Sequence, residues 1–289
     1  MFSGAITALA TPFRDGSVDY EALDELVNWQ IDSGIDGLLA CGCTGEAATL
    51  TGEEHLGVIK RVIETADGRV PVIAGTGKND TASSVELSAA ASGMGADGVL
   101  LITPYYNKPT PRGQIEHYTK VADAVECPVV LYNVPGRTGT NMLPETVAKL
   151  SQHGSIVAIK DAAGSAERVT AIRGLCDITV LSGDDPIAMA QVALGASGVV
   201  SVISNIAPGE MSDLVSLTAE GSLKEARALQ QRLYPLMKAL FLETNPIPVK
   251  KALSLLGLTT DEMRLPLVSM TEALVPKLEE AMREAEVLK

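Results

Sequence analysis

The sequence predicts an α/β protein, a closed (β/α)₈ barrel with a C-terminal helical appendage. Eight short apolar runs bounded by glycine or proline alternate with segments whose apolar residues recur every 3.6 positions, as in crossover helices. The runs are apolar almost throughout, which is typical of parallel strands buried on both faces. Apolar residues make up 46% of the 289-residue chain and aromatic residues only 3%, so we expect small aliphatic side chains to build the core.

The expected strands are residues 5–9, 37–41, 70–74, 98–103, 128–133, 156–160, 178–182 and 198–202. Clear helical spacing follows the first three strands, at residues 20–31, 53–65 and 81–94. Helix starts agree with this order. Thr51 and Glu54 match a capping box, Asp185 precedes Pro186 as an N-cap, and Pro144 marks another helix start.

A doubly wound sheet is the main alternative fold, but it needs an early G-x-G-x-x-G phosphate turn. The turn at 75–77 follows the third expected strand and lacks the third glycine, so we interpret it as a loop. From about residue 207 onward we expect no strand, and the segments 223–242, 247–256 and 270–287 are interpreted as helices. We therefore divide the chain into a catalytic barrel core, residues 1–206, whose closing helix extends past this boundary, and a helical region, residues 207–289.

Charge and cysteine content exclude several classes of protein. A formal net charge of −13 without a basic cluster argues against a nucleic-acid partner. The four cysteines form no C-x-x-C pair and have no histidine at ligand spacing, which argues against a zinc site or a disulfide framework and favours a reducing compartment. The first residues lack a basic, apolar leader, and no segment is long enough to span a membrane. We expect a soluble, cytoplasmic protein.

Lys160 is the first candidate for chemistry, because it ends the run at 155–159, which is apolar after Ser155. Burial lowers the pKa of a lysine and populates the neutral amine, which attacks carbonyl carbon to form a Schiff base. A lysine just past a strand is more often a solvated end-cap, so this feature alone does not establish a catalytic role for Lys160. In a (β/α)₈ barrel, however, reactive groups lie at the carboxyl ends of the strands, and the segments 42–46, 103–107, 132–139 and 182–185 would share that rim with Lys160.

These segments carry a specific combination of motifs. A G-x-T-G-E turn at 42–46, Tyr-Asn-Val-Pro at 132–135, Ile-Lys at 159–160 and Ser-Gly-Asp-Asp at 182–185 follow one another in this order and spacing. The combination resembles the dihydrodipicolinate synthase and N-acetylneuraminate lyase family of pyruvate-dependent aldolases, over essentially the whole chain. The segments 136–139 and 245–250 are similar to the synthase branch rather than to the sugar-acid lyases.

The resemblance implies a Schiff-base lyase that condenses pyruvate with L-aspartate 4-semialdehyde to give 4-hydroxy-tetrahydrodipicolinate, in lysine (diaminopimelate) biosynthesis. Lys160 would form the imine and Tyr132 would carry protons. Thr44 and Tyr106 would link Tyr132 to solvent, and the tyrosine at 106 would come from the partner subunit. Activity would then require a tight dimer. The family's usual assembly is a homotetramer built as a dimer of dimers, and the sequence leaves dimer and tetramer open. No metal and no organic cofactor is implied.

Substrate binding follows from the same resemblance. The backbone N–H groups of Cys43 and Thr44 would hold the pyruvate carboxylate, and the carbonyl of Val200 would face the bound pyruvate. Arg137 would clamp the carboxylate of aspartate semialdehyde in a two-point fork. One departure is Cys43 itself, because the synthases usually carry threonine there and a thiol is a weaker hydrogen-bond partner. Asp161, where many relatives have glutamate, is a milder change.

A possible effector site is a second implication, because bacterial synthases often bind lysine in the tight-dimer cleft. Residues that fit this pattern are Ala48, His55, Asn79 and Tyr105. Ser83 stands where lysine-sensitive members carry glutamate, so a partner for the effector's ammonium group is missing. We expect weak or absent inhibition by lysine.

Two other functions remain open from the sequence. A pyruvate aldolase acting on N-acetylneuraminate or a keto-deoxy sugar acid would keep Lys160 and Tyr132, although Arg137 and the segment 245–250 argue against it. A non-catalytic ligand-binding barrel is the second, since fold alone does not establish function. Taken singly, the same residues have simpler interpretations, with Thr44 as a turn hydroxyl, Arg137 as a solvated loop charge and the pair at 184–185 as a helix start.

Overall fold

The computed structural model describes residues 2–288 as a closed barrel of eight parallel strands, in the order β1-β10-β9-β8-β7-β6-β5-β4. Each strand begins and ends within two residues of its expected position, so the predicted (β/α)₈ architecture is confirmed. The barrel closes through β1, which pairs with both β10 and β4. The strands are β1 (Gly4–Ala8), β4 (Gly37–Ala40), β5 (Val72–Gly75), β6 (Gly98–Ile102), β7 (Val129–Asn133), β8 (Ile156–Asp161), β9 (Thr179–Ser182) and β10 (Gly198–Ser201).

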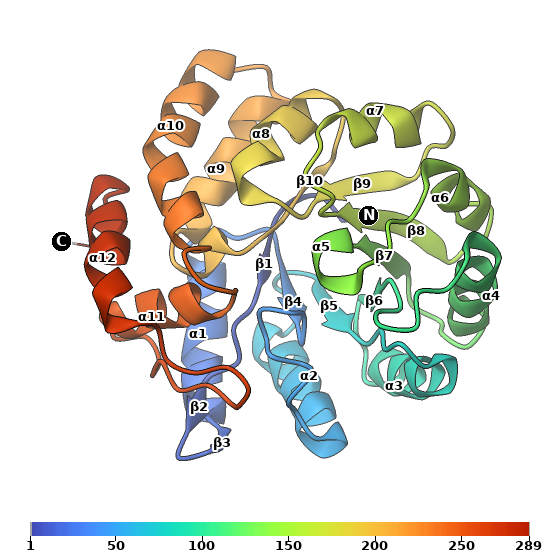
Figure 1. Ribbon diagram of the computed structural model, residues 1–289, viewed down its shortest axis with the longest axis horizontal. Helices are drawn as coiled ribbons and strands as arrows, with labels where there is room; N and C mark the ends of the chain where they lie inside the picture. Colours follow the sequence, from blue (N-terminus) through green and yellow to red (C-terminus); the bar gives the residue numbers. More distant parts are fainter. Residues whose placement is uncertain (1, 289) are drawn as a thin grey trace.

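Helices that follow the strands surround the barrel (Figure 1). They are α1 (Tyr20–Asp32), α2 (Gly52–Ala66), α3 (Thr81–Gly93), α4 (Pro111–Ala122), α5 (Pro135–Thr138), α6 (Pro144–Leu150), α7 (Glu167–Arg173), α8 (Asp185–Ala193), η1 (Ile203–Asn205) and α9 (Pro208–Ala219). The capping box at the start of α2 is confirmed, since Thr51 accepts from the Glu54 backbone and Glu54 accepts from the Thr51 backbone. Pro144 is the first residue of α6, as expected.

Two local features differ from expectation. The N-cap of α8 is Asp184 rather than Asp185, which is already helical. The carboxylate of Asp185 instead accepts the backbone N–H groups of Val202 and Ile203, at 2.9 and 3.0 Å, and so ties α8 to the end of β10. The second difference is a small antiparallel hairpin, β2 (Phe13–Arg14) and β3 (Ser17–Val18), which was not predicted because its strands are too short to show a period.

The C-terminal appendage is helical, as expected. It contains α10 (Leu223–Ala239), α11 (Ile247–Leu255), η2 (Glu272–Leu274) and α12 (Val275–Glu284), and up to residue 288 no strand follows β10. Helix α10 packs against α8, α9 and α12, on one side of the barrel (Figure 1). One apolar core extends from the outer face of the sheet into these helices, and the division at residue 206/207 stays a prediction.

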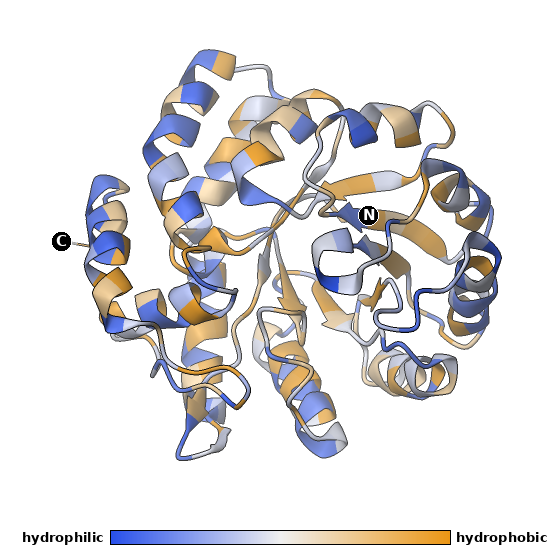
Figure 2. Ribbon diagram, viewed as in Figure 1, coloured by the Kyte–Doolittle hydropathy of each residue, from blue (hydrophilic) through white to orange (hydrophobic). Residues whose placement is uncertain are grey.

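Apolar side chains fill two separate layers. Inside the barrel lies a small core that includes Ile6, Leu39, Ile73, Val130 and Leu181. A larger core lies between the strands and the helices. Figure 2 shows the corresponding pattern, with hydrophobic strands in the centre and hydrophilic residues on the outer faces of the helices. In the described part of the chain, no helix is both long and apolar enough to cross a membrane.

Candidate active site

Lys160 and Tyr132 lie side by side on the neighbouring strands β8 and β7, where they are in register. The Lys160 Nζ is 4.3 Å from the centroid of the Tyr132 ring. Lys160 is only 6% exposed and Tyr132 only 5%, so the lysine is not a solvated end-cap. Burial lowers the pKa of Lys160 and raises the pKa of Tyr132 well above its usual value. The pair therefore combines an amine that loses its proton more readily with a phenol that keeps its own.

Two carboxylates at the start of α8 act on the same amine. Asp184 and Asp185 both raise the pKa of Lys160, in opposition to the larger effect of burial. Burial also raises the pKa of each carboxyl. The simple interpretation of this pair as a helix start is correct, since Asp184 is the N-cap of α8 and Asp185 its first residue. The electrostatic effect on Lys160 is a further property of both residues.

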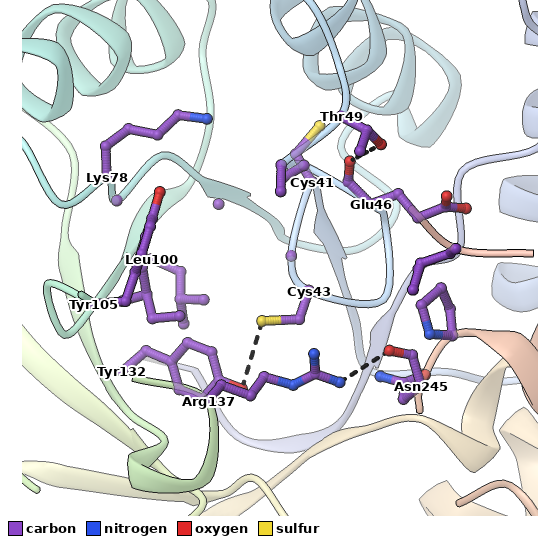
Figure 3. Close-up of a pocket in the computed structure, with 18 of the residues that line it drawn as sticks. Cys41, Cys43, Glu46, Thr49, Lys78, Leu100, Tyr105, Tyr132, Arg137 and Asn245 are labelled. Carbon is purple, nitrogen blue, oxygen red and sulfur yellow. Dashed lines mark hydrogen bonds between the residues drawn. The ribbon is translucent and has the colours of Figure 1, made fainter. Parts of the chain in front are cut away.

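Cys43, rather than Thr44, lies beside the Tyr132 hydroxyl. The Cys43 Sγ is 4.0 Å from the Tyr132 Oη (Figure 3). Thr44 is buried, and its hydroxyl accepts from the Nδ2 of Asn245 at 3.0 Å. Successive residues of the turn thus project to different sides, and the expected contact of Thr44 with Tyr132 is not formed within the chain.

The turn at 42–46 contains two backbone N–H groups that are free of intrachain hydrogen bonds. Its own bonds run from the N–H of Gly45 to the carbonyl of Gly42 and from the N–H of Glu46 to the carbonyl of Cys43. Within residues 2–288 the N–H groups of Cys43 and Thr44 have no acceptor. Adjacent free N–H groups at a turn are suited to hold a carboxylate.

Arg137 lies across the cavity from Lys78, on the short helix α5 (Figure 3). Its Nη2 donates to the backbone carbonyl of Asn245 at 2.9 Å. That single bond fixes the guanidinium at the cavity wall and leaves its other donors for a ligand. The cavity has a volume of about 280 Å³ and is lined by Cys43, Tyr132, Arg137 and Asn245, among others.

Comparison with known proteins decides the family. The model described as the dihydrodipicolinate synthetase family matches residues 1–285. The chain belongs to this family. The 4-hydroxy-tetrahydrodipicolinate synthase of Geobacter sulfurreducens is 53% identical over 100% of both chains. Among solved structures, the dihydrodipicolinate synthase of Aquifex aeolicus is 45% identical with a TM-score of 0.97, covering 99% of each chain. The chloride-inhibited enzyme of Acinetobacter baumannii, solved with pyruvate, is 44% identical with a TM-score of 0.97 over 100% of each chain.

The remaining residues that the family resemblance singled out are dispersed. Tyr106 is 89% exposed, has a left-handed backbone with φ of 70°, and does not line the cavity. Val200 is buried inside the barrel on β10, in register with Ile6 of β1. Thus a single chain brings Tyr132, Cys43 and Arg137 to the lining of one cavity. Lys160 packs against the Tyr132 ring without itself lining the cavity, and Tyr106 stays on the surface.

The four possible effector residues also separate into two groups. Ala48 and Tyr105 line the cavity, whereas His55 and Asn79 do not. The His55 ring is buried, with Nε2 2.8 Å from the carbonyl of Gly75, and burial lowers its pKa to about 4. The carbonyl of Asn79 accepts from the Asn107 side chain at 2.7 Å.

Sequence reasoning missed the residues that fasten the turn from the C-terminal region. Lys250 on α11 is fully buried, and its Nζ lies 2.6 Å from the Glu46 Oε1 and 3.0 Å from the Thr11 carbonyl. Asn245, just before α11, bonds to both Thr44 and Arg137. The available signal was Lys250 directly after the apolar run 246–249, because a charge placed beside such a run can be buried and then needs a partner.

Proposed function

We propose that this chain is the enzyme that condenses pyruvate with L-aspartate 4-semialdehyde to give 4-hydroxy-tetrahydrodipicolinate, in lysine biosynthesis. The observation that carries the proposal is the buried Lys160 amine against the ring of Tyr132, a residue that lines one cavity together with Arg137. The relatives that are about half identical over the full chain carry this activity in their names. The sugar-acid aldolase and the non-catalytic barrel have no comparable support.

The chemistry begins with the neutral amine of Lys160, which attacks the ketone carbon of pyruvate. Loss of water gives an imine, and loss of a methyl proton converts it to an enamine. The enamine carbon attacks the aldehyde of the second substrate, which forms the new carbon–carbon bond. The amino group of that substrate then attacks the imine carbon, closes the ring and releases Lys160 as the free amine. One water is lost overall, so the atoms balance.

We assign proton transfer in this reaction to Tyr132 and Cys43. The raised pKa of Tyr132 keeps its phenol protonated, so it is a donor to the hydroxide that leaves the carbinolamine. Cys43 is its neighbour at 4.0 Å, and we propose the thiol in place of Thr44 as the next member of the relay. Thr44 then acts with its backbone N–H, beside that of Cys43, in holding the pyruvate carboxylate. The carbonyl of Val200 faces the bound pyruvate in this proposal.

Selectivity for the second substrate is assigned to Arg137, whose guanidinium is suited to a carboxylate. The experiment compares aspartate semialdehyde, N-acetylneuraminate and keto-deoxygluconate as substrates of the purified protein. We expect consumption of aspartate semialdehyde with pyruvate and no cleavage of either sugar acid. In Arg137→Met, KM for aspartate semialdehyde rises while binding of pyruvate is retained. Cleavage of a sugar acid without condensation would contradict the proposal.

Assembly as a tight dimer, and as a dimer of such dimers, is also proposed. Tyr106 supports the dimer, because a left-handed backbone is unfavourable for tyrosine and its side chain is 89% exposed in the single chain. A contact with a second subunit would stabilise this conformation. Entry of its ring into the site of the partner subunit is that contact, and it completes the relay from Tyr132 to solvent. The expected cytoplasmic location belongs to the same proposal. Sedimentation analysis of the wild type and of Tyr106→Ala tests the assembly, with a weaker dimer and lower turnover expected for the variant.

A further inference from the structure

A buried polar network lies directly behind the pair formed by Tyr132 and Lys160, and the proposed reaction does not use it. The residues that follow this pair are Asn133 and Asp161, which are in register on β7 and β8. Successive side chains of a strand point to opposite faces, so Asn133 and Asp161 point away from the barrel interior. Asn133 is 0% exposed and Asp161 is 1% exposed. Polar side chains so deeply buried need partners.

Arg168 is the main partner of Asp161. It lies on α7, on the outer side of the barrel (Figure 1), and its side chain is only 11% exposed. Its Nε donates to both carboxylate oxygens of Asp161, at 3.1 and 2.9 Å, and its Nη2 lies 2.8 Å from Oδ2. The carboxylate also accepts from the Nδ2 of Asn133 at 3.1 Å and from the N–H of Ala163 at 3.2 Å. A forked, charge-assisted contact of this kind fixes the carboxylate in position and orientation.

The same network holds the loop that carries Arg137. The Asn133 side chain donates to the Oδ1 of Asn141 at 2.9 Å and accepts from the N–H of Met142 at 2.9 Å. Arg168 uses its Nη2 to donate to the Met142 carbonyl, also at 2.9 Å. These bonds close the loop between Asn133 and Met142, which includes α5 and therefore Arg137. The ends of β7 and β8 and the loop of Arg137 thus share one anchor.

We propose that the Arg168–Asp161 ion pair is a positioning device, which holds the Lys160 amine in the alignment that imine formation requires. Asn133 extends the same constraint to Tyr132, its neighbour on β7. None of the network residues belongs to the described lining of the cavity, so the network acts through the strands and not by touching a substrate. The inference rests on the proposed function, since it takes Lys160 as the amine that captures pyruvate. A displacement of about 1 Å at reacting groups can cost about a hundredfold in rate.

The rate of pyruvate capture tests the positioning role. Arg168→Met is mixed with pyruvate, the reaction is stopped with borohydride after increasing times, and the adduct on the Lys160 peptide is measured. We expect the rate constant to fall about 10- to 100-fold, while the final yield per mole of protein stays at the wild-type level. A role in stability alone would lower the yield, through unfolded protein, at an unchanged rate. Arg173→Met is the matched control, since Arg173 is exposed at the other end of α7, and it leaves both quantities unchanged.

Two further variants keep the test decisive if Arg168→Met folds poorly. The double variant Asp161→Asn/Arg168→Met leaves no unpaired buried charge, so we expect it to fold, which circular dichroism checks. It still lacks the fork, and we expect it to capture pyruvate at least about tenfold more slowly than the wild type. Arg168→Lys keeps the charge without the planar fork, and we expect it to recover only part of the rate.

The possible failures can be told apart. A wild-type rate of capture in both Arg168→Met and the double variant would overturn the positioning role and leave the proposed function intact. A lower yield at an unchanged rate would overturn it as well, because the ion pair would then serve stability alone. Absence of a pyruvate-dependent adduct on Lys160 in the wild type would refute the proposed function, and the positioning role with it.

Discussion

The buried ion pair between Lys250 and Glu46 is the contact through which α11 holds the turn at 42–46. Both side chains are at most 1% exposed, and the charged atoms are 2.6 Å apart. At an effective dielectric constant of about 20, their attraction is about 6 kcal/mol. Desolvation of both ions offsets much of it, but Lys250→Met leaves the buried Glu46 carboxylate without its ion-pair partner, with only the backbone N–H of Arg264 donating to its Oε2 at 3.3 Å. We expect the free energy of unfolding to fall by about 3–5 kcal/mol.

Two control variants test whether the loss of stability comes from the unpaired charge of Glu46. The double variant Lys250→Met/Glu46→Gln leaves no buried charge, so its loss is expected to be smaller than that of the single variant. Lys251→Met removes the neighbouring lysine, whose partner Asp261 is partly exposed, and costs at most about 1 kcal/mol. Guanidinium-induced unfolding, followed by circular dichroism at fixed protein concentration, measures all three. A loss below 1 kcal/mol in Lys250→Met, or a double variant less stable than the single one, would refute the reasoning.

Three further predictions concern the cavity. Cys43→Thr keeps or raises turnover, because a hydroxyl replaces the thiol beside Tyr132. Cys43→Val, which has neither group, lowers turnover. A large loss of turnover in Cys43→Thr would show that the thiol has a role of its own. Asp184→Asn removes a negative charge that raises the pKa of Lys160, so the pKa of the amine falls in the variant. The rate of pyruvate capture rises with pH as the amine loses its proton. That rate is therefore expected to reach its plateau at a lower pH in Asp184→Asn than in the wild type. An unshifted pH profile would contradict this. Lysine inhibits weakly or not at all, and strong inhibition in a sub-millimolar titration would overturn that expectation.

The barrel was predictable because its strands carry their signal locally. Each strand is a short apolar run, and the turn residues that bound it are close in sequence. The placement of Lys160 at a strand end followed from the same local pattern. The two short strands around Asp15 were not predictable by period, although their Asp-Gly turn, with φ of 52° and 80°, is typical of a hairpin.

The sequence does not specify directions and distances within the site. Cys43 and Thr44 are adjacent, and only the conformation of the turn decides which of them faces Tyr132. The partners of that turn lie about two hundred positions away, at Asn245 and Lys250. Contacts between single polar residues that are far apart in the chain produce no periodic pattern in the sequence. They can therefore be identified only from the folded structure.

The central claim, that Lys160 is a buried amine which condenses with pyruvate, has a direct test in reductive trapping. The protein is treated with borohydride in the presence and absence of pyruvate, and its tryptic peptides are weighed by mass spectrometry. We predict a pyruvate-dependent adduct on the peptide that contains Lys160, and none in Lys160→Arg. An unmodified Lys160 peptide, or an adduct on another lysine of the wild type, would contradict the account.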